Sequence, residues 1–339
     1  MSAAPAFAQP SQPVAEQQSL PAVFRLDPAF DRIVAPDVRI EKLVTIAGVN
    51  GEGPIWRKDE LWIADIPGGS VYAIKGDGSY RVVAREAGGR INPDLAMPAR
   101  TRQGAVGMTH WRDGAVLVCG GAAREIGLLD RNGQRSSFLT SFEGKHLNSP
   151  NDLVVARDGA LWFTDPAYSV PGYSPVPGSP VPPDKQMPFN GVFRFYKGQL
   201  QAMIRDLEVP NGLAFSRDGK TLYVANSAPE MFVRAYSVAA DGSLSNPREF
   251  ARFAEADRKG PGSPDGLKVD VQGHVWLAGP GGLHVFTPEG RLLGRIQFPV
   301  KAANMTFGED GSTLFVTAGD TVYRLRTLVK GQAPLYAPR

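Results

Sequence analysis

The segment Arg217-Asp218-Gly219-Lys220-Thr221-Leu222-Tyr223-Val224-Ala225-Asn226 carries the pattern that decides the fold of this chain. An Asp-Gly pair, which favours a tight turn, is followed at once by a run of β-branched, aliphatic and aromatic residues, and this combination is typical of a hairpin leading into a strand. The same arrangement recurs clearly at residues 157–165 and 309–317. Weaker copies lie at residues 58–65, 112–118 and 271–277, which makes six copies in total.

The spacing of the copies indicates how they assemble. They follow one another at intervals of about 40 to 60 residues, which suits propeller blades better than the shorter, more helical units of a solenoid. The 38 glycines and 29 prolines, spread over 339 residues, also favour many tight turns between short strands. We therefore predict an all-β fold, a six-bladed β-propeller. An N-terminal strand commonly closes such a ring, so residues 38–44 are predicted to pair beside residues 321–325.

Two regions depart from the repeat. Residues 1–22 are rich in Ala, Pro and Gln and are predicted to be a disordered tail or the remnant of a signal peptide, which leaves residues 23–339 as one propeller domain. Between Asp165 and Asn190, eight prolines interrupt the third repeat. Because proline removes backbone donors, the loop at about 166–190 is expected to cross the surface as a stiff cover, either a lid over the active face or a passive loop.

Composition restricts the classes of partner. The formal net charge is only +3 and no run of like charges is present, so the sequence supports neither nucleic-acid binding nor a membrane anchor. No apolar run approaches the length of a membrane span. The single cysteine, Cys119, excludes an intramolecular disulfide and a cysteine-based zinc site. A small molecule is the expected partner, and the sequence carries no signal for an oligomeric state.

The N-terminus carries one indication of location. Ala6-Phe7-Ala8 followed by Gln9 has the small-x-small form of a signal-peptidase site, although no basic or apolar region precedes it. We therefore expect a periplasmic or secreted protein, with the cytoplasm as the alternative.

Four short segments place an oxygen-bearing side chain just before a strand. These are Glu52 in Gly-Glu-Gly-Pro, Asn151 in Pro-Asn-Asp-Leu, Asn211 in Pro-Asn-Gly-Leu and Asp265 in Pro-Asp-Gly-Leu. If the segments are equivalent parts of a closed ring, the side chains converge. Two carboxylates and two amide carbonyls suit a hard divalent cation, Ca²⁺ before Zn²⁺, Mn²⁺ or Mg²⁺. Taken singly, each Asn or Asp is better explained by the capping of a turn, and the metal hypothesis rests on all four motifs at the same blade position.

These motifs, in this order, resemble those of the SMP-30/gluconolactonase/LRE-like lactonases, over roughly residues 38–328. The resemblance implies a six-bladed propeller with one divalent metal in the central channel, held by Glu52, Asn151, Asn211 and Asp265. It also implies hydrolysis of sugar-acid lactones. Ser149 stands where animal members have an arginine, and the Leu-Asn-Ser-Pro-Asn-Asp form resembles the bacterial branch. Substrate orientation is therefore expected to differ from that of the animal enzymes.

In the mechanism that this resemblance implies, the metal polarises the lactone carbonyl and stabilises the oxyanion that forms. Asp265 is the catalytic candidate, either as general base or as the group that orients a hydroxide on the metal. His110 and His146 are further candidates because imidazole titrates in the useful range, and a structural role is the alternative for both. Polar groups expected near the channel, as substrate contacts or as packing and turn residues, are Asn148, Tyr168 and Asn226.

Other classes of function compete with this hypothesis. A phosphotriester or organophosphate hydrolase on the same scaffold is one, since a Lewis-acidic calcium also polarises P=O. A non-catalytic propeller that binds protein or carbohydrate is another, and it predicts no bound metal. A lyase resembling strictosidine synthase would share the architecture but is expected to lack the complete ligand set.

Overall fold

The computed structural model describes residues 21–90, 103–258 and 260–337. Blades one and two are built from consecutive antiparallel strands, which are β3 (Gly51–Arg57), β4 (Glu60–Asp65), β5 (Val71–Ile74), β6 (Tyr80–Ala84), and β7 (Met108–His110), β8 (Val116–Gly120), β9 (Glu125–Leu129), β10 (Arg135–Leu139). Blades three and four follow with β13 (Leu153–Val155), β14 (Leu161–Asp165), β15 (Gly191–Tyr196), β16 (Gln199–Ile204), and β17 (Pro210–Phe215), β18 (Thr221–Asn226), β19 (Met231–Val238), β20 (Leu244–Phe253).

The last two blades each recruit a strand from the N-terminal part of the chain. Blade five has β21 (Leu267–Val269), β22 (Val275–Gly279), β23 (Gly282–Phe286), β24 (Leu292–Gln297) and, at its outer edge, β1 (Ala22–Arg25). Blade six has β25 (Ala302–Gly308), β26 (Thr313–Ala318), β27 (Thr321–Arg326) and β2 (Ile40–Thr45). Smaller elements are the hairpin β11 (Ser141–Phe142) and β12 (Lys145–His146), and the 3₁₀ turns η1 (Pro28–Arg32), η3 (Arg112–Gly114) and η4 (Glu255–Asp257).

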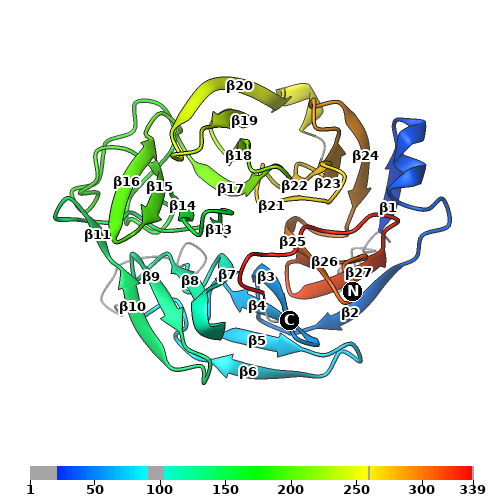
Figure 1. Cartoon of the computed structure of the whole chain (residues 1–339), viewed down its shortest axis with the longest axis horizontal. Helices are drawn as coiled ribbons and strands as arrows, with labels where there is room; N and C mark the ends of the chain where they lie inside the picture. The colour runs from blue at the N-terminus through cyan, green and yellow to red at the C-terminus, as the bar shows by residue number, and fades with distance from the viewer. Residues whose placement is uncertain (1–20, 91–102, 259, 338–339) are drawn as a thin grey trace, which may run out of the picture.

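The six sheets stand around one axis, and their first strands form the inner ring (Figure 1). The predicted all-β, six-bladed propeller is confirmed. Every copy of the sequence repeat marks the turn into the second strand of a blade, namely β4, β8, β14, β18, β22 or β26. The turn residues therefore set the phase of each blade, and the alternating run that follows becomes its buried second strand.

Ring closure occurs where the sequence predicted it. β2 pairs antiparallel with β27, with Ile40 opposite Leu325 and Thr45 opposite Thr321. A second attachment was not anticipated: β1, which begins at the last residue assigned to the tail, pairs with β24 through Ala22 opposite Gln297. The N-terminal segment thus covers the outer edges of two blades, and both edges are protected from pairing with other chains.

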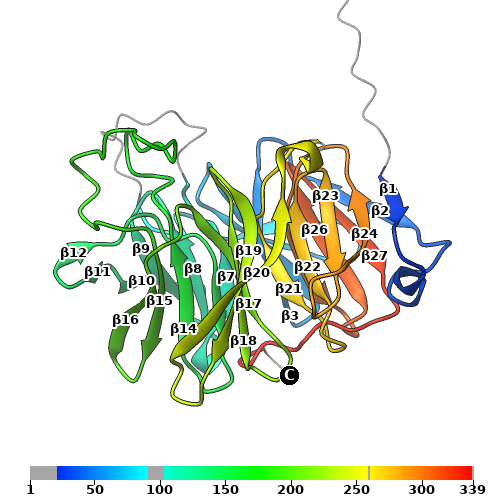
Figure 2. The ribbon, with the colours of Figure 1, turned by 90° about the horizontal axis from the view of Figure 1, so that it is seen from above.

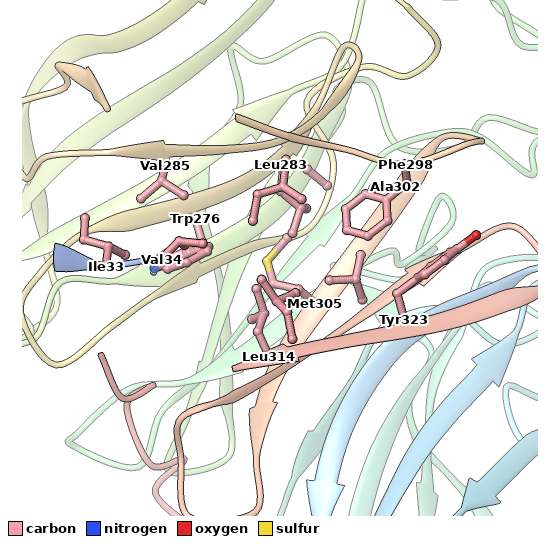
Figure 3. Close-up of a cluster of buried hydrophobic side chains, with 14 of the residues drawn as sticks. Ile33, Val34, Trp276, Leu283, Val285, Phe298, Ala302, Met305, Leu314 and Tyr323 are labelled. Carbon is pink, nitrogen blue, oxygen red and sulfur yellow. The ribbon is translucent and has the colours of Figure 1, made fainter. Parts of the chain in front are cut away.

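Apolar side chains fill the space between neighbouring blades. In the cluster shared by blades five and six, Trp276, Leu283, Met305 and Leu314 are buried together, and Val34 of the N-terminal segment packs among them (Figure 3). Burial of each large side chain contributes about 1.5–3 kcal/mol to the stability of the fold, so the apolar side chains packed between two blades fix the angle between them. None of the helices in the described ranges has the length and hydropathy that a membrane span requires.

The two ends of the ring carry different segments. Residues 166–190, all described, contain no strand and lie at one end, whereas the C-terminal segment crosses the opposite end (Figure 2). We call these the upper and the lower end. Gly331 pairs with Asp270, and the Tyr336 ring lies edge-on to Trp111, so the C-terminal segment spans the lower end from blade five to blade two. Of the predicted tail or signal-peptide remnant at residues 1–22, residues 1–20 lie outside the described residues.

Candidate functional site

The proposed ligand residues occupy equivalent positions where the inner strands begin, at the upper end of the channel. The Asp265 N–H donates to the Ala278 carbonyl at 2.8 Å, and the Ala278 N–H donates back to Gly266 at 2.9 Å. Asn151 and Asp152 make the same pair of bonds with Thr164, both at 3.0 Å. In blades one and four, register shifts follow Glu52 and Pro210 at the corresponding places. A local irregularity of the ladder therefore recurs at the ligand position in these four blades, at or just before the start of the inner strand.

The glycines of the motifs allow the inner strands to approach closely. A Cβ at Gly212 would lie 2.1 Å from the Asp265 carbonyl oxygen, and one at Gly53 would lie 2.2 Å from the Val106 carbonyl oxygen. Gly53 also has φ of +53°, a conformation that favours glycine. The Gly in Pro-Asn-Gly and in Glu-Gly-Pro thus has a packing role beyond turn formation, because it lets the inner strand approach the backbone of the next blade closely.

The two carboxylates lie in one buried, negatively charged environment. Glu52 is 5% exposed and Asp265 is 7% exposed. Burial, followed by the charge of Asp265, raises the pKa of Glu52 to about 8, and the charge of Asp152 adds to this. Lys301 places its Nζ 2.5 Å from Asp265 Oδ2, and the Asp265 charge raises the pKa of that ammonium. The carboxylates are therefore close enough to repel each other, and a cation between them would relieve the repulsion.

Hydrogen bonds orient one of the two ligand amides, that of Asn211. Asn211 donates from Nδ2 to Ser227 Oγ at 3.1 Å and to the Tyr168 hydroxyl at 3.3 Å, which leaves its Oδ1 to accept. The Asn151 backbone is fully used, by the Gly107 N–H and the Thr164 carbonyl. Within the described residues, no hydrogen bond engages its side-chain amide. An all-oxygen set with two buried carboxylates and two accepting amides fits a hard divalent cation.

Tyr168 joins this group from the proline-rich loop. Burial and then the charge of Asp265 raise its pKa to about 12, so the phenol stays protonated and can donate at neutral pH. The Tyr168 hydroxyl and the Lys301 ammonium are thus two hydrogen-bond donors that lie beside the carboxylates at the upper end of the channel. The structure thus brings together Glu52, Asp265, Asn211 and Tyr168.

Asn226 instead performs a structural task that recurs in other blades. Its Oδ1 accepts from the Val209 N–H at 2.9 Å, and its Nδ2 donates to the carbonyls of Ala228 and Glu230. Asp165 and Asp65 do the same for their own blades, accepting from the N–H groups of residues 148, 149 and 50. The Asp or Asn that ends each of these second strands therefore ties down the loop before the inner strand.

Asn148 anchors the proline-rich loop. Its Nδ2 donates to the carbonyls of Phe189 at 2.9 Å and Asp165 at 3.2 Å, while its Oδ1 is buried without a described partner. Arg124 adds a second tie, from Nε to Leu147 O at 2.7 Å and from Nη1 to Asp184 O at 2.9 Å. The loop is thus fixed to blades two and three at the upper end.

The two histidines lie apart from this group. His110 is buried on β7, bonds Trp56 O through Nε2 at 3.0 Å, and has its pKa lowered to about 4 by burial. It lines a cavity of about 760 Å³ in the lower half of the channel, which includes none of the four proposed ligands. His146 is exposed on the β11–β12 hairpin, where its backbone N–H donates to Gln186. We place the site at the upper end, despite this large lower cavity, because the buried carboxylates are there.

Three residues of this region were missed at the level of sequence: Lys301, Asp152 and Asn304. Lys301 lies in the turn before β25, and Asn304 lies on β25 in a blade without a Pro-Asn or Pro-Asp motif, so neither carried a signal. Asp152 was visible in Pro-Asn-Asp-Leu, because the other three motifs have glycine at that position. That difference between equivalent segments was the one available indication.

Comparison with known proteins identifies the family of this chain. The family model described as SMP-30/Gluconolactonase/LRE-like region matches residues 50–320. The chain belongs to this family. It is 33% identical over 320 residues to a gluconolactonase of Zymomonas mobilis, covering 91% of this chain and 87% of that one. It is 27% identical to the pentonolactonase XacC of Haloferax volcanii, over 79% of this chain and 80% of the relative. The structure of a Xanthomonas campestris gluconolactonase superposes with a TM-score of 0.76 and 30% identity, covering 94% and 99% of the two chains.

Proposed function

We propose that this protein is a divalent-cation-dependent hydrolase that opens sugar-acid lactones at the upper end of its channel. Its family membership and the names of its relatives, one acting on gluconolactone and another on pentonolactones, make it a lactone-hydrolysing enzyme. The observation that supports a bound cation is the pair of buried carboxylates, Glu52 and Asp265, which lie near amide side chains that can coordinate it through oxygen.

Glu52, Asn151, Asn211 and Asp265 would hold the cation, with Ca²⁺ favoured by the absence of nitrogen and sulfur donors from this set. When bound, a divalent cation supplies Lewis-acid polarisation of the lactone carbonyl and stabilisation of the developing negative charge. The protein's own groups do the rest. Asp265 accepts the proton of the attacking water or orients it, and the Tyr168 hydroxyl and the Lys301 ammonium donate to substrate oxygens at the entrance.

The proline-rich loop completes this proposal as a fixed cover. It contributes Tyr168, and Asn148 and Arg124 tie it to the ring, so its conformation is set before substrate arrives. A preorganised cover limits water around the reacting carbonyl. We also propose a periplasmic or secreted location, on the Ala6-Phe7-Ala8 motif.

A paired experiment tests the function. Calcium titration by calorimetry should detect one binding event, and a panel of aldonolactones followed by proton release should show hydrolysis that a chelator abolishes. Asp265→Asn should abolish turnover and weaken Ca²⁺. Faster turnover of phosphotriesters than of any lactone would favour the rival hydrolase. Absence of both heat and stabilisation by Ca²⁺ would favour a non-catalytic propeller.

A further inference from the structure

In each of the six blades we compare the residue that follows the ligand position or, in blades two and six, the position equivalent to it. It is glycine in four blades and carries a side chain in two, Asp152 in blade three and Asn304 in blade six. The equivalence of blade six follows from its backbone, because Gly266 N–H donates to Ala303 O at 3.0 Å just as Gly107 N–H donates to Asn151 O at 2.8 Å. Blades three and six are opposite in a ring of six, so the two side chains enter the channel from opposite sides.

Asn304 is directed at a proposed ligand. It is 1% exposed, and its Nδ2 donates to Glu52 Oε1 at 2.6 Å. Its Oδ1 accepts from the Met305 N–H at 2.8 Å and from Lys268 Nζ at 3.3 Å. Two donors on the oxygen side leave the NH₂ group to face the carboxylates, so the orientation of the amide is determined by its neighbours.

The fold reserves space for this amide. A Cβ at Gly266 would lie 2.1 Å from Asn304 Cγ, so the glycine of Pro-Asp-Gly in blade five is what admits the Asn304 side chain. The buried Asp152 carboxylate lies near this amide, which acts to lower the pKa of Asp152, and it is close enough to Glu52 and Asp265 to interact with their charges. The amide therefore links the proposed ligand Glu52 to Lys268, next to the buried Asp152 carboxylate.

We infer that Asn304 is a positioning residue that holds Glu52 in its cation-binding orientation, with Lys268 and the Met305 N–H fixing the amide. The inference rests on the proposed function of the same site. By occupying Oε1, Asn304 would leave Oε2 of Glu52 as the oxygen available to a cation. Partners of metal ligands that orient them in this way typically account for about 10-fold to 100-fold in metal affinity.

The test is calcium titration of Asn304→Leu by calorimetry, together with kcat and KM for the best lactone and the unfolding temperature without Ca²⁺. We expect Ca²⁺ affinity to fall by about 10-fold to 100-fold, with partial recovery in Asn304→Ser, which leaves room for a water to bridge to Glu52. The matched control is Thr317→Val. Thr317 Oγ1 donates to the Asn304 backbone carbonyl at 3.3 Å, so this variant loses a buried bond in the same strand pair without touching Glu52.

The outcomes separate this inference from the proposed function. If the unaltered protein binds no Ca²⁺, the proposed function itself fails. If it binds Ca²⁺ and hydrolyses a lactone while Asn304→Leu and Asn304→Ser keep its affinity within two-fold, the positioning role alone is overturned. Equal losses of affinity in Asn304→Leu and Thr317→Val would also overturn it, because general damage to blade six would then explain both. Should Asn304→Leu not fold, Asn304→Ser carries the same comparison.

Discussion

The raised pKa of Glu52 makes cation binding depend on pH in a defined direction. Burial and the charge of Asp265 raise that pKa to about 8, so between pH 6 and 8 most Glu52 side chains are protonated in the cation-free protein. A cation needs the carboxylate, and binding must therefore release a proton. The apparent Ca²⁺ affinity should rise about 9-fold from pH 6 to 7 and about 5-fold from pH 7 to 8, and level off above pH 8.

The raised pKa of Glu52 also makes the stability of the folded protein fall as pH rises, whereas a carboxylate with a lowered pKa makes it rise. The pKa of Glu52 in the folded protein lies above its ordinary value of 4.5, so the native state holds the proton more tightly than the unfolded chain does. Without Ca²⁺, the Glu52 contribution to stability is complete below pH 4.5 and is lost as pH rises to about 8. With saturating Ca²⁺ this loss should be offset, and the stabilisation by Ca²⁺ should grow over the same range.

Calorimetry in buffers of different ionisation enthalpy measures both the affinity and the number of protons released. We expect close to one proton per cation at pH 6.5 and close to none at pH 9. Glu52→Gln is the companion variant, and its weak binding should show little dependence on pH in this range. An affinity that stays level from pH 6 to 8, or binding without proton release at pH 6.5, would contradict the assignment of Glu52 as a ligand.

Three further predictions follow from the fold and the site. Deleting residues 1–45 removes the β1–β24 and β2–β27 pairings and should cost most of the stability, and an unchanged unfolding temperature would refute this account of closure. Asn226→Leu removes three hydrogen bonds and should destabilise the protein by about 2–4 kcal/mol in urea unfolding, with KM unchanged if its role is structural. His110→Gln should retain most of the lactonase rate, because His110 lines the lower cavity, and a loss of more than about 10-fold would bring His110 back into the mechanism.

Local patterns predicted much of the fold because its information is local and repeated. An Asp-Gly turn followed by an alternating strand needs only neighbouring residues to be recognised, and each copy proved to be the second strand of a blade. The closing strand was also predictable, since a ring leaves an edge that must be covered. The attachment of β1 could not be predicted, because a four-residue strand with one exposed and no fully buried residue has almost no pattern of alternating hydrophobicity.

For the candidate site, too, some residue roles could be predicted from the sequence and others could not. Glu52, Asn151, Asn211 and Asp265 remain the predicted ligands, and they were visible because each lies in a motif at one blade position. Asn226 has the same amide side chain as Asn151 and Asn211, but it does not lie at their position in the blade. It ends a second strand, where its amide binds backbone, and that difference is visible only once the strands are paired.

By itself, the sequence determined the blade repeat, the phase of each strand and the oxygen-rich character of the ligand motifs, because these depend on residue type and spacing along the chain. Only the tertiary structure decided which side chains share one electrostatic environment. Glu52 and Asn304 are separated by 252 positions, yet their side-chain atoms lie 2.6 Å apart. Ring closure brings the first blade against the sixth, and hydrogen bonds and charge coupling depend on distance in space, not along the chain.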